Sequence, residues 1–122
     1  MASIVEIVSY FNNAKQQAIV WHQQTEVYSE HKTLNGFYDE IVDLLDGLVE
    51  STSGVYGRPT GYSVQTLKDY TDPQQVYNYF VDLYNYVQNQ RAGIYQETWI
   101  QNQVDEIAAE IAQTIYLLTL KK

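Results

Sequence analysis

Four side chains that can bind a metal ion stand at regular positions in the first half of the chain. His31, Asp46 and Glu50 follow the pattern H-x14-D-x3-E, and His22 lies nine positions before His31. The chain has two histidines and no cysteine, so imidazoles and carboxylates are its strong ligand groups. Two imidazoles with two carboxylates suit Fe(II), Mn(II) or Zn(II) better than Cu(I).

The spacing of these residues prevents one copy of the chain from completing such a site. His31 and Asp46 are expected on one continuous helix, where a rise of about 1.5 Å per residue separates them by roughly 22 Å. Metal ligands lie about 2 Å from a shared ion. A turn between the first two helices can bring the imidazoles of His22 and His31 together within one chain. Two antiparallel copies could then place them opposite Asp46 and Glu50 of the other subunit. We therefore expect a homodimer or a higher homo-oligomer.

The same residues also have a simpler interpretation. A histidine near a helix end often caps backbone carbonyls, and a carboxylate pair on a helix usually faces water. The neighbouring Asp39, Glu40 and Asp43 make this segment acidic in any case. The Glu-x-x-His motif of di-iron carboxylate bundles does not occur in the sequence, which disfavours a site buried inside a single bundle.

Four segments carry apolar residues at three- and four-residue spacing, which predicts four helices. We expect them over residues 3–24, 29–52, 73–91 and 95–120. The residues predicted to face the core are Ile4, Ile7, Val8, Phe11, Ala18, Trp21 or His22, Leu34, Tyr38, Ile41, Leu45, Leu48, Val76, Phe80, Leu83, Val87, Trp99, Ile107, Ile111, Ile115 and Leu118.

Capping residues mark the starts of three of these helices. Ser3 with Glu6 fits a capping box, Ser29 is a suitable N-cap for the second helix, and Asp72-Pro73 suits the start of the third. Residues 53–72 are predicted to form a long connection that contains a short helix over residues 63–70. This order predicts an all-α, ferritin-like four-helix bundle with a long crossover, formed by residues 1–122 as one domain.

Composition excludes several classes of function. The net charge is −8 and the seven basic residues are scattered, whereas DNA binding requires clustered lysine and arginine. No stretch reaches the roughly eighteen apolar residues of a membrane span, and the N-terminus lacks the basic and apolar regions of a secretion signal. We expect an intracellular protein that binds neither nucleic acid nor membrane. No motif supports hydrolase or nucleotide-dependent chemistry.

The segment WHQQTEVYSEHKTLNGFYDEIVDLLDGLVES resembles the core of the Dps miniferritins, which oxidise and store iron. The spacing of His31, Asp46 and Glu50 matches three ferroxidase ligands of that family, and His22 would be the fourth, three residues closer to His31 than is usual. The resemblance implies an iron site shared between subunits and a short helix between the second and third helices. The basic DNA-binding arm of many Dps proteins is absent here.

A resemblance that spans most of the chain is to small ferritin-like proteins of tailed bacteriophages. The shared segments are H-x-Q-T from His22, the stretch around Tyr28–Lys32, FYDE from Phe37, YGR from Tyr56, and the ending Val104–Lys121. It supports the fold and the placement of the metal ligands more than any physiological role. Together the two resemblances imply a Dps-like iron-binding protein, with a ferroxidase site between subunits, in the host cytoplasm or the virion. The alternative is a non-catalytic structural or interaction bundle that associates with phage virion or capsid proteins.

Overall fold

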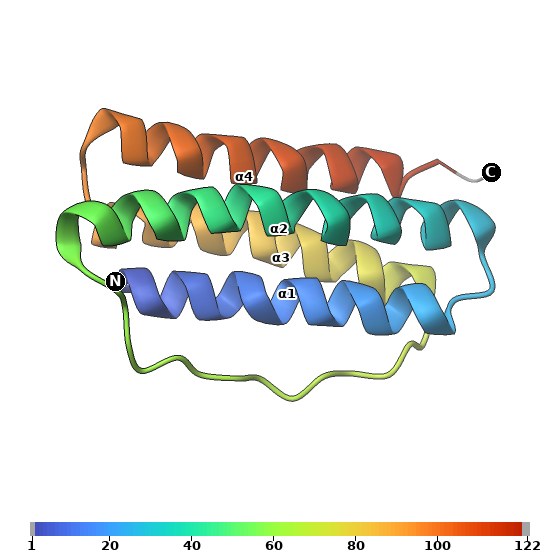
Figure 1. Ribbon diagram of the computed structural model, residues 1–122. Helices are drawn as coiled ribbons and strands as arrows, with labels where there is room; N and C mark the ends of the chain where they lie inside the picture. Colours follow the sequence, from blue (N-terminus) through green and yellow to red (C-terminus); the bar gives the residue numbers. More distant parts are fainter. Residues whose placement is uncertain (1, 121–122) are drawn as a thin grey trace.

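The computed structural model describes residues 2–120 and places them in four α-helices (Figure 1). The expected all-α class is confirmed, because the described residues contain four long helices and no strand. No described helix has the length and apolarity that crossing a bilayer requires. The helices are α1 (Ile4–Gln24), α2 (Tyr28–Tyr56), α3 (Pro73–Gln90) and α4 (Thr98–Leu117), with a short 3-10 helix, η1 (Arg91–Gly93), before α4.

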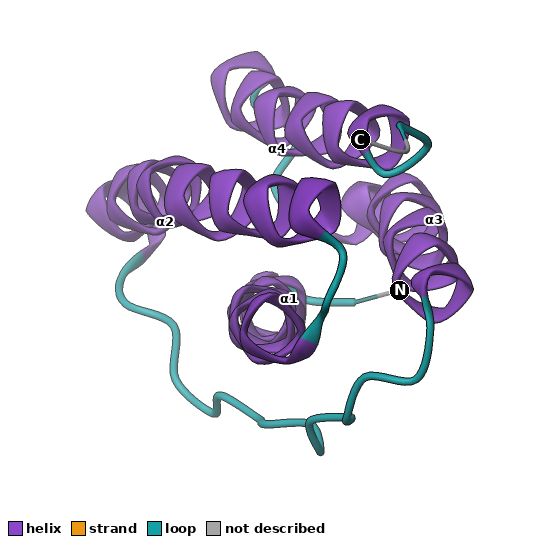
Figure 2. Cartoon of the chain, turned by 90° about the vertical axis from the view of Figure 1, so that its right-hand side faces the viewer, coloured by secondary structure: helices purple, strands orange, loops and turns teal. Residues whose placement is uncertain are grey.

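The four helices pack lengthwise around one apolar core. α1 packs chiefly against α2, and α4 packs against both α2 and α3 (Figure 2). At the centre, the rings of Phe37 and Phe80 meet edge to face with their centroids 4.8 Å apart. All four residues predicted to face inward from α3 are buried. On α4 the prediction for Trp99 is wrong: its side chain is 41% exposed and Ile100, one position further around the helix, is buried instead.

The helix boundaries confirm two of the three predicted caps. The Ser3 backbone N–H and hydroxyl both donate to the Glu6 carboxylate at the start of α1, and Asp72 accepts the Gln75 N–H at the start of α3. The predicted N-cap at Ser29 is wrong, because α2 begins at Tyr28.

Helix α2 is longer than predicted at both ends. At its start, the Thr25 hydroxyl accepts the N–H of Val27 and turns the chain into the helix before Ser29. At its end, it continues past the predicted end at residue 52 and stops at Gly57, whose φ of +89° favours glycine.

The connection from α2 to α3, residues 57–72, is called the strap here. It runs along the outside of α1 and contains no helix, so the short helix predicted over residues 63–70 is wrong (Figures 1 and 2). Side chains on α1 hold it in an extended form. The hydrogen bonds are Ser63 N–H to Ser9 Oγ (3.1 Å), Asn13 Nδ2 to Gln65 Oε1 (2.9 Å), Gln17 Nε2 to the Lys68 carbonyl (2.8 Å), Lys68 N–H to Gln17 Oε1 (2.9 Å), Gln24 Nε2 to Asp69 Oδ1 (2.9 Å) and Tyr70 N–H to Gln24 Oε1 (2.7 Å).

Length explains why the strap is extended. From Ser9 to Gln24, α1 rises roughly 22 Å. The matching strap residues, Ser63 to Tyr70, reach roughly 23 Å when extended but only about 10 Å as a helix. A helical strap could not reach all of its partners on α1, and the buried polar side chains there would lose their hydrogen bonds.

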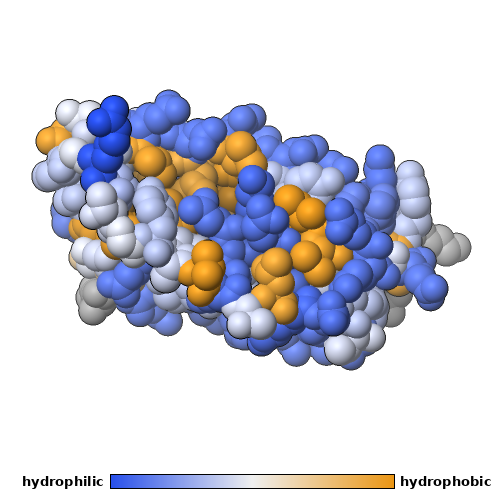
Figure 3. Space-filling model, turned by 60° about the horizontal axis from the view of Figure 1, so that its bottom comes forward, coloured by the Kyte–Doolittle hydropathy of each residue, from blue (hydrophilic) through white to orange (hydrophobic). Residues whose placement is uncertain are grey.

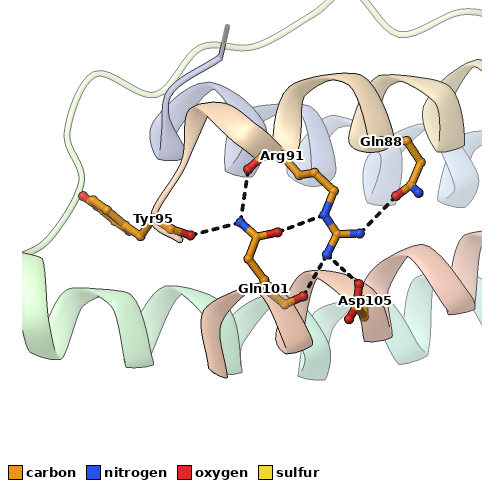
Figure 4. Close-up of polar contacts among 5 residues, drawn as sticks. All are labelled: Gln88, Arg91, Tyr95, Gln101 and Asp105. Carbon is orange, nitrogen blue, oxygen red and sulfur yellow. Dashed lines mark hydrogen bonds and ion pairs between the residues drawn. The ribbon is translucent and has the colours of Figure 1, made fainter. Parts of the chain in front are cut away.

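The turn between α3 and α4 is fixed by one guanidinium group (Figure 4). Arg91 donates from Nε to Gln101 Oε1 (2.9 Å) and from Nη2 to the Gln101 carbonyl (2.9 Å) and Asp105 (2.5 Å). It also donates to Gln88 from Nη1 (3.1 Å). The Gln101 amide in turn donates to the carbonyls of Arg91 and Tyr95. These contacts replace helical hydrogen bonds where the chain reverses.

Candidate metal-binding site

The two histidines lie together at one end of the bundle. His22 belongs to the last turn of α1 and His31 to the first turn of α2, so the short connection over residues 25–27 brings them together. Their rings stack with centroids 3.8 Å apart and planes 16° from parallel. The prediction that a turn could join the two imidazoles within one chain is confirmed.

Each histidine is hydrogen bonded to the backbone of the other. His22 Nδ1 lies 2.7 Å from the His31 carbonyl oxygen, and His31 Nδ1 lies 2.8 Å from the His22 carbonyl oxygen. A carbonyl oxygen only accepts, so both Nδ1 atoms must carry the proton. In the neutral rings, both Nε2 atoms then hold the lone pair that binds a metal. This is the tautomer that metal-binding histidines adopt when a backbone carbonyl orients them.

One aromatic ring packs on the pair, and a buried residue is adjacent to each histidine in the chain. Tyr38 packs edge to face on His22 with ring centroids 5.3 Å apart, and Trp21 is fully buried beside it in the chain. Glu30, next to His31, is 6% exposed and accepts the Thr25 hydroxyl at 2.6 Å. The sequence interpretation missed Glu30 as a buried group, because a glutamate in the first turn of a helix is usually placed there by the helix dipole alone.

Asp46 and Glu50 lie far along α2 from the histidines. Both are exposed, and no hydrogen bond or ion pair within the described residues engages either carboxylate. At about 100° per residue, Asp46 and Glu50 lie roughly 60° and 100° around α2 from His31. Asp46 and Glu50 therefore lie on the same side of α2 as His31 but near the other end of the helix. Glu50 borders an open groove of about 670 Å³ whose lining includes Arg58 and Tyr62.

No complete metal site forms within one described chain. Residues 2–120 contain no group of three or more His, Cys, Asp or Glu side chains close enough to hold an ion. The structure thus brings His22 and His31 together and leaves Asp46 and Glu50 apart from them, as their spacing along α2 requires.

Comparisons with known proteins give a family but no established activity. The model of a family of unknown function, DUF5856, matches residues 22–118. An uncharacterised 14.6 kDa protein from the mobD-ri intergenic region of Enterobacteria phage T4 is 27% identical over 115 residues, which cover 93% of this chain and 80% of the T4 protein. No solved structure matches the chain.

Proposed function

The chain belongs to this family of unknown function, and we propose that it is a ferritin-like iron-binding protein whose site forms between two copies. His22 and His31 of one subunit and Asp46 and Glu50 of the other are the proposed ligands. The long crossover between α2 and α3 supports a ferritin-like bundle. The spacing of His31, Asp46 and Glu50 resembles that of the Dps miniferritins, although His22 lies three residues closer to His31 than is usual and the crossover here is extended rather than helical.

The pairing of the two histidines is the observation that carries this proposal. Both Nδ1 atoms are held by backbone carbonyls, which fixes the ring orientations and leaves both Nε2 atoms available. Stacking between His22 and His31 holds the rings nearly parallel, so one ring must turn for both in-plane Nε2 lone pairs to reach a single ion. Each histidine makes one such bond, as a histidine that caps a helix also does, and the second imidazole against its face is the feature that capping does not require.

A second copy supplies the carboxylates if the two α2 helices run antiparallel. The two-fold axis then crosses α2 about midway between His31 and the Asp46/Glu50 pair, near Asp39. Asp39 is exposed, and its carboxylate accepts a hydrogen bond from Asn35 Nδ2 at 2.8 Å. Like charges that meet at the axis cost free energy, and cations bound at the two sites offset that cost.

Iron is the proposed substrate of this site. Carboxylate oxygens favour Fe(III) over Fe(II), so they promote the loss of one electron from each bound Fe(II) to oxygen or peroxide. Manganese or zinc also fits two imidazoles and two carboxylates. Neutral imidazoles are required for binding, so we expect metal affinity to fall in acid.

The direct test is aerobic oxidation of Fe(II), with Asp46→Ala/Glu50→Ala compared with the wild type. We expect the variant to fall to the rate of Fe(II) in buffer. The matched control, Asp82→Ala/Glu106→Ala, removes two exposed carboxylates that lie outside α2 and should keep most of the activity. Equal rates in the wild type and the Asp46/Glu50 variant would exclude a ferroxidase site at these residues.

A second candidate function is a structural or interaction protein of a phage. The phage origin of the T4 relative is consistent with it. Apolar strap side chains that face water could serve such an association: Tyr62 (48% exposed), Val64 (95%) and Leu67 (42%). Figure 3, which looks from below, shows separate apolar patches on a mostly hydrophilic face. In this case, protein purified from iron-supplemented cells would be metal-free and would co-purify with phage particles. Stoichiometric iron in a protein free of particles would argue against it.

A further inference from the structure

Glu30, a buried acidic residue, is among the residues that line a small, mostly apolar cavity at the end of the bundle where α2 begins. The cavity has a volume of about 310 Å³, at the lower end of the range of small-molecule sites, about 300–1,000 Å³. Glu30 is its one acidic residue. The other lining residues are mostly apolar and come from the starts of α2 and α3 and the end of α4: Val27, Ser29, Pro73, Leu117, Leu118, Thr119 and Leu120.

The charge of Glu30 is only partly compensated inside the protein. The Thr25 hydroxyl donates to Oε1 at 2.6 Å, and the start of α2 supplies a partial positive charge. No hydrogen bond or ion pair from the described residues reaches Oε2. The Tyr70 hydroxyl is buried beside Thr25 and Glu30, without a hydrogen bond of good geometry to either. Burial raises the pKa of Tyr70, and the Glu30 carboxylate raises it further.

This combination selects one class of ligand. A carboxylate removed from water binds an ammonium group strongly, because a charge-assisted hydrogen bond is stronger where the dielectric constant is low. The leucines at the end of α4 offer apolar surface to an alkyl chain. We propose that this cavity binds a primary alkylammonium ion, with its head on Glu30 and its chain against Leu117 and Leu118. The net charge of −8 attracts the same cations.

The test is a titration of the full chain with n-hexylammonium, in which binding is measured from the backbone amide NMR shifts. We expect saturable binding with shifts around Glu30 and Leu118. Glu30→Gln, which keeps the shape of the side chain, should bind at least ten-fold more weakly. Glu26→Gln removes an exposed carboxylate from the connection just before α2 and should bind like the wild type.

Two further arms separate this site from nonspecific attraction or misfolding. 1-Hexanol, which has the same chain without the charge, should bind at least ten-fold more weakly than n-hexylammonium. Leu118→Trp fills the cavity with a larger side chain and should abolish binding, while circular dichroism confirms that both Glu30→Gln and Leu118→Trp fold. Equal affinity of Glu30→Gln and the wild type, or of hexanol and hexylammonium, would overturn the proposal. Neither result would bear on the histidine site.

Discussion

The side-chain amide of Gln17 pairs with both backbone groups of Lys68. Gln17 Nε2 donates to the Lys68 carbonyl at 2.8 Å, and Gln17 Oε1 accepts the Lys68 N–H at 2.9 Å. Gln17 is 1% exposed, so this pair ties the strap to the buried face of α1. Gln17→Ala should therefore loosen the strap and lower the free energy of unfolding by about 1–3 kcal/mol.

Trypsin gives a local measurement of this effect, because it cleaves after Lys68. We expect Gln17→Ala to be cut there several-fold faster than the wild type under native conditions. Gln16→Ala is the control, since Gln16 is exposed and no hydrogen bond joins it to the strap. Unchanged cleavage in Gln17→Ala would show that the strap is held by other contacts.

Arg91→Lys should weaken the turn between α3 and α4. The guanidinium reaches Gln88, Gln101 and Asp105 at once, whereas an ammonium group cannot reproduce this planar arrangement. We expect a loss of about 1–2 kcal/mol in the free energy of unfolding, measured by urea denaturation. Arg58→Lys changes an exposed arginine and should stay within about 0.5 kcal/mol of the wild type. If Arg91→Lys is no less stable than Arg58→Lys, the network contributes little.

Glu110→Gln should stabilise the protein at neutral pH. Burial raises the pKa of Glu110 above its ordinary 4.5, and the charge of Glu40 raises it further. The folded state therefore holds the Glu110 proton to a higher pH than the unfolded chain, and wild-type stability falls as pH rises through this interval. Glu110→Gln removes that loss, which is less than about 1 kcal/mol because solvent screens a partly exposed group.

The measurement for this prediction is the thermal midpoint at pH 7 and near pH 4. Glu110→Gln should melt above the wild type at pH 7, and the difference should shrink at the lower pH. Glu106→Gln, at an exposed position on the same helix, is the control and should show no such pH dependence. A constant difference at both pH values would contradict the assignment to Glu110.

The sequence predicted the helices well and the strap poorly, for one physical reason. Apolar periodicity reports the face that a helix buries, which is why Val76, Phe80 and the rest of the α3 stripe were predicted correctly. It does not report buried polar side chains. Ser9, Asn13 and Gln17 recur every four residues and are buried. That regular polar stripe is the signal that could have predicted an extended segment against α1.

The sequence likewise predicted only part of the candidate site. The short link between His22 and His31 sufficed to predict their proximity. The hydrogen bond from each histidine to the carbonyl of the other depends on the exact path of the chain between α1 and α2. That path places the start of α2 at Tyr28, before the predicted N-cap at Ser29. The buried environment of Glu30 depends on the ends of α3 and α4, which are distant in sequence. Local pattern cannot supply either feature.

The central claim is that one metal site takes its histidines and its carboxylates from different chains. One variant is His22→Asn/His31→Asn, in which the asparagine amide can still donate to the carbonyl while the metal-binding Nε2 is lost. The other is Asp46→Ala/Glu50→Ala. The two are co-expressed with different tags so that mixed dimers can be isolated, and circular dichroism verifies that each variant folds.

The rate of Fe(II) oxidation by the mixed dimer is the most direct measurement. In a two-fold dimer, the mixed species holds one site with all four ligands and one with none, so it should show about half of the wild-type rate. Each variant alone should be inactive. A mixed dimer as inactive as its two parents, beside an active wild type, would contradict a site shared between chains.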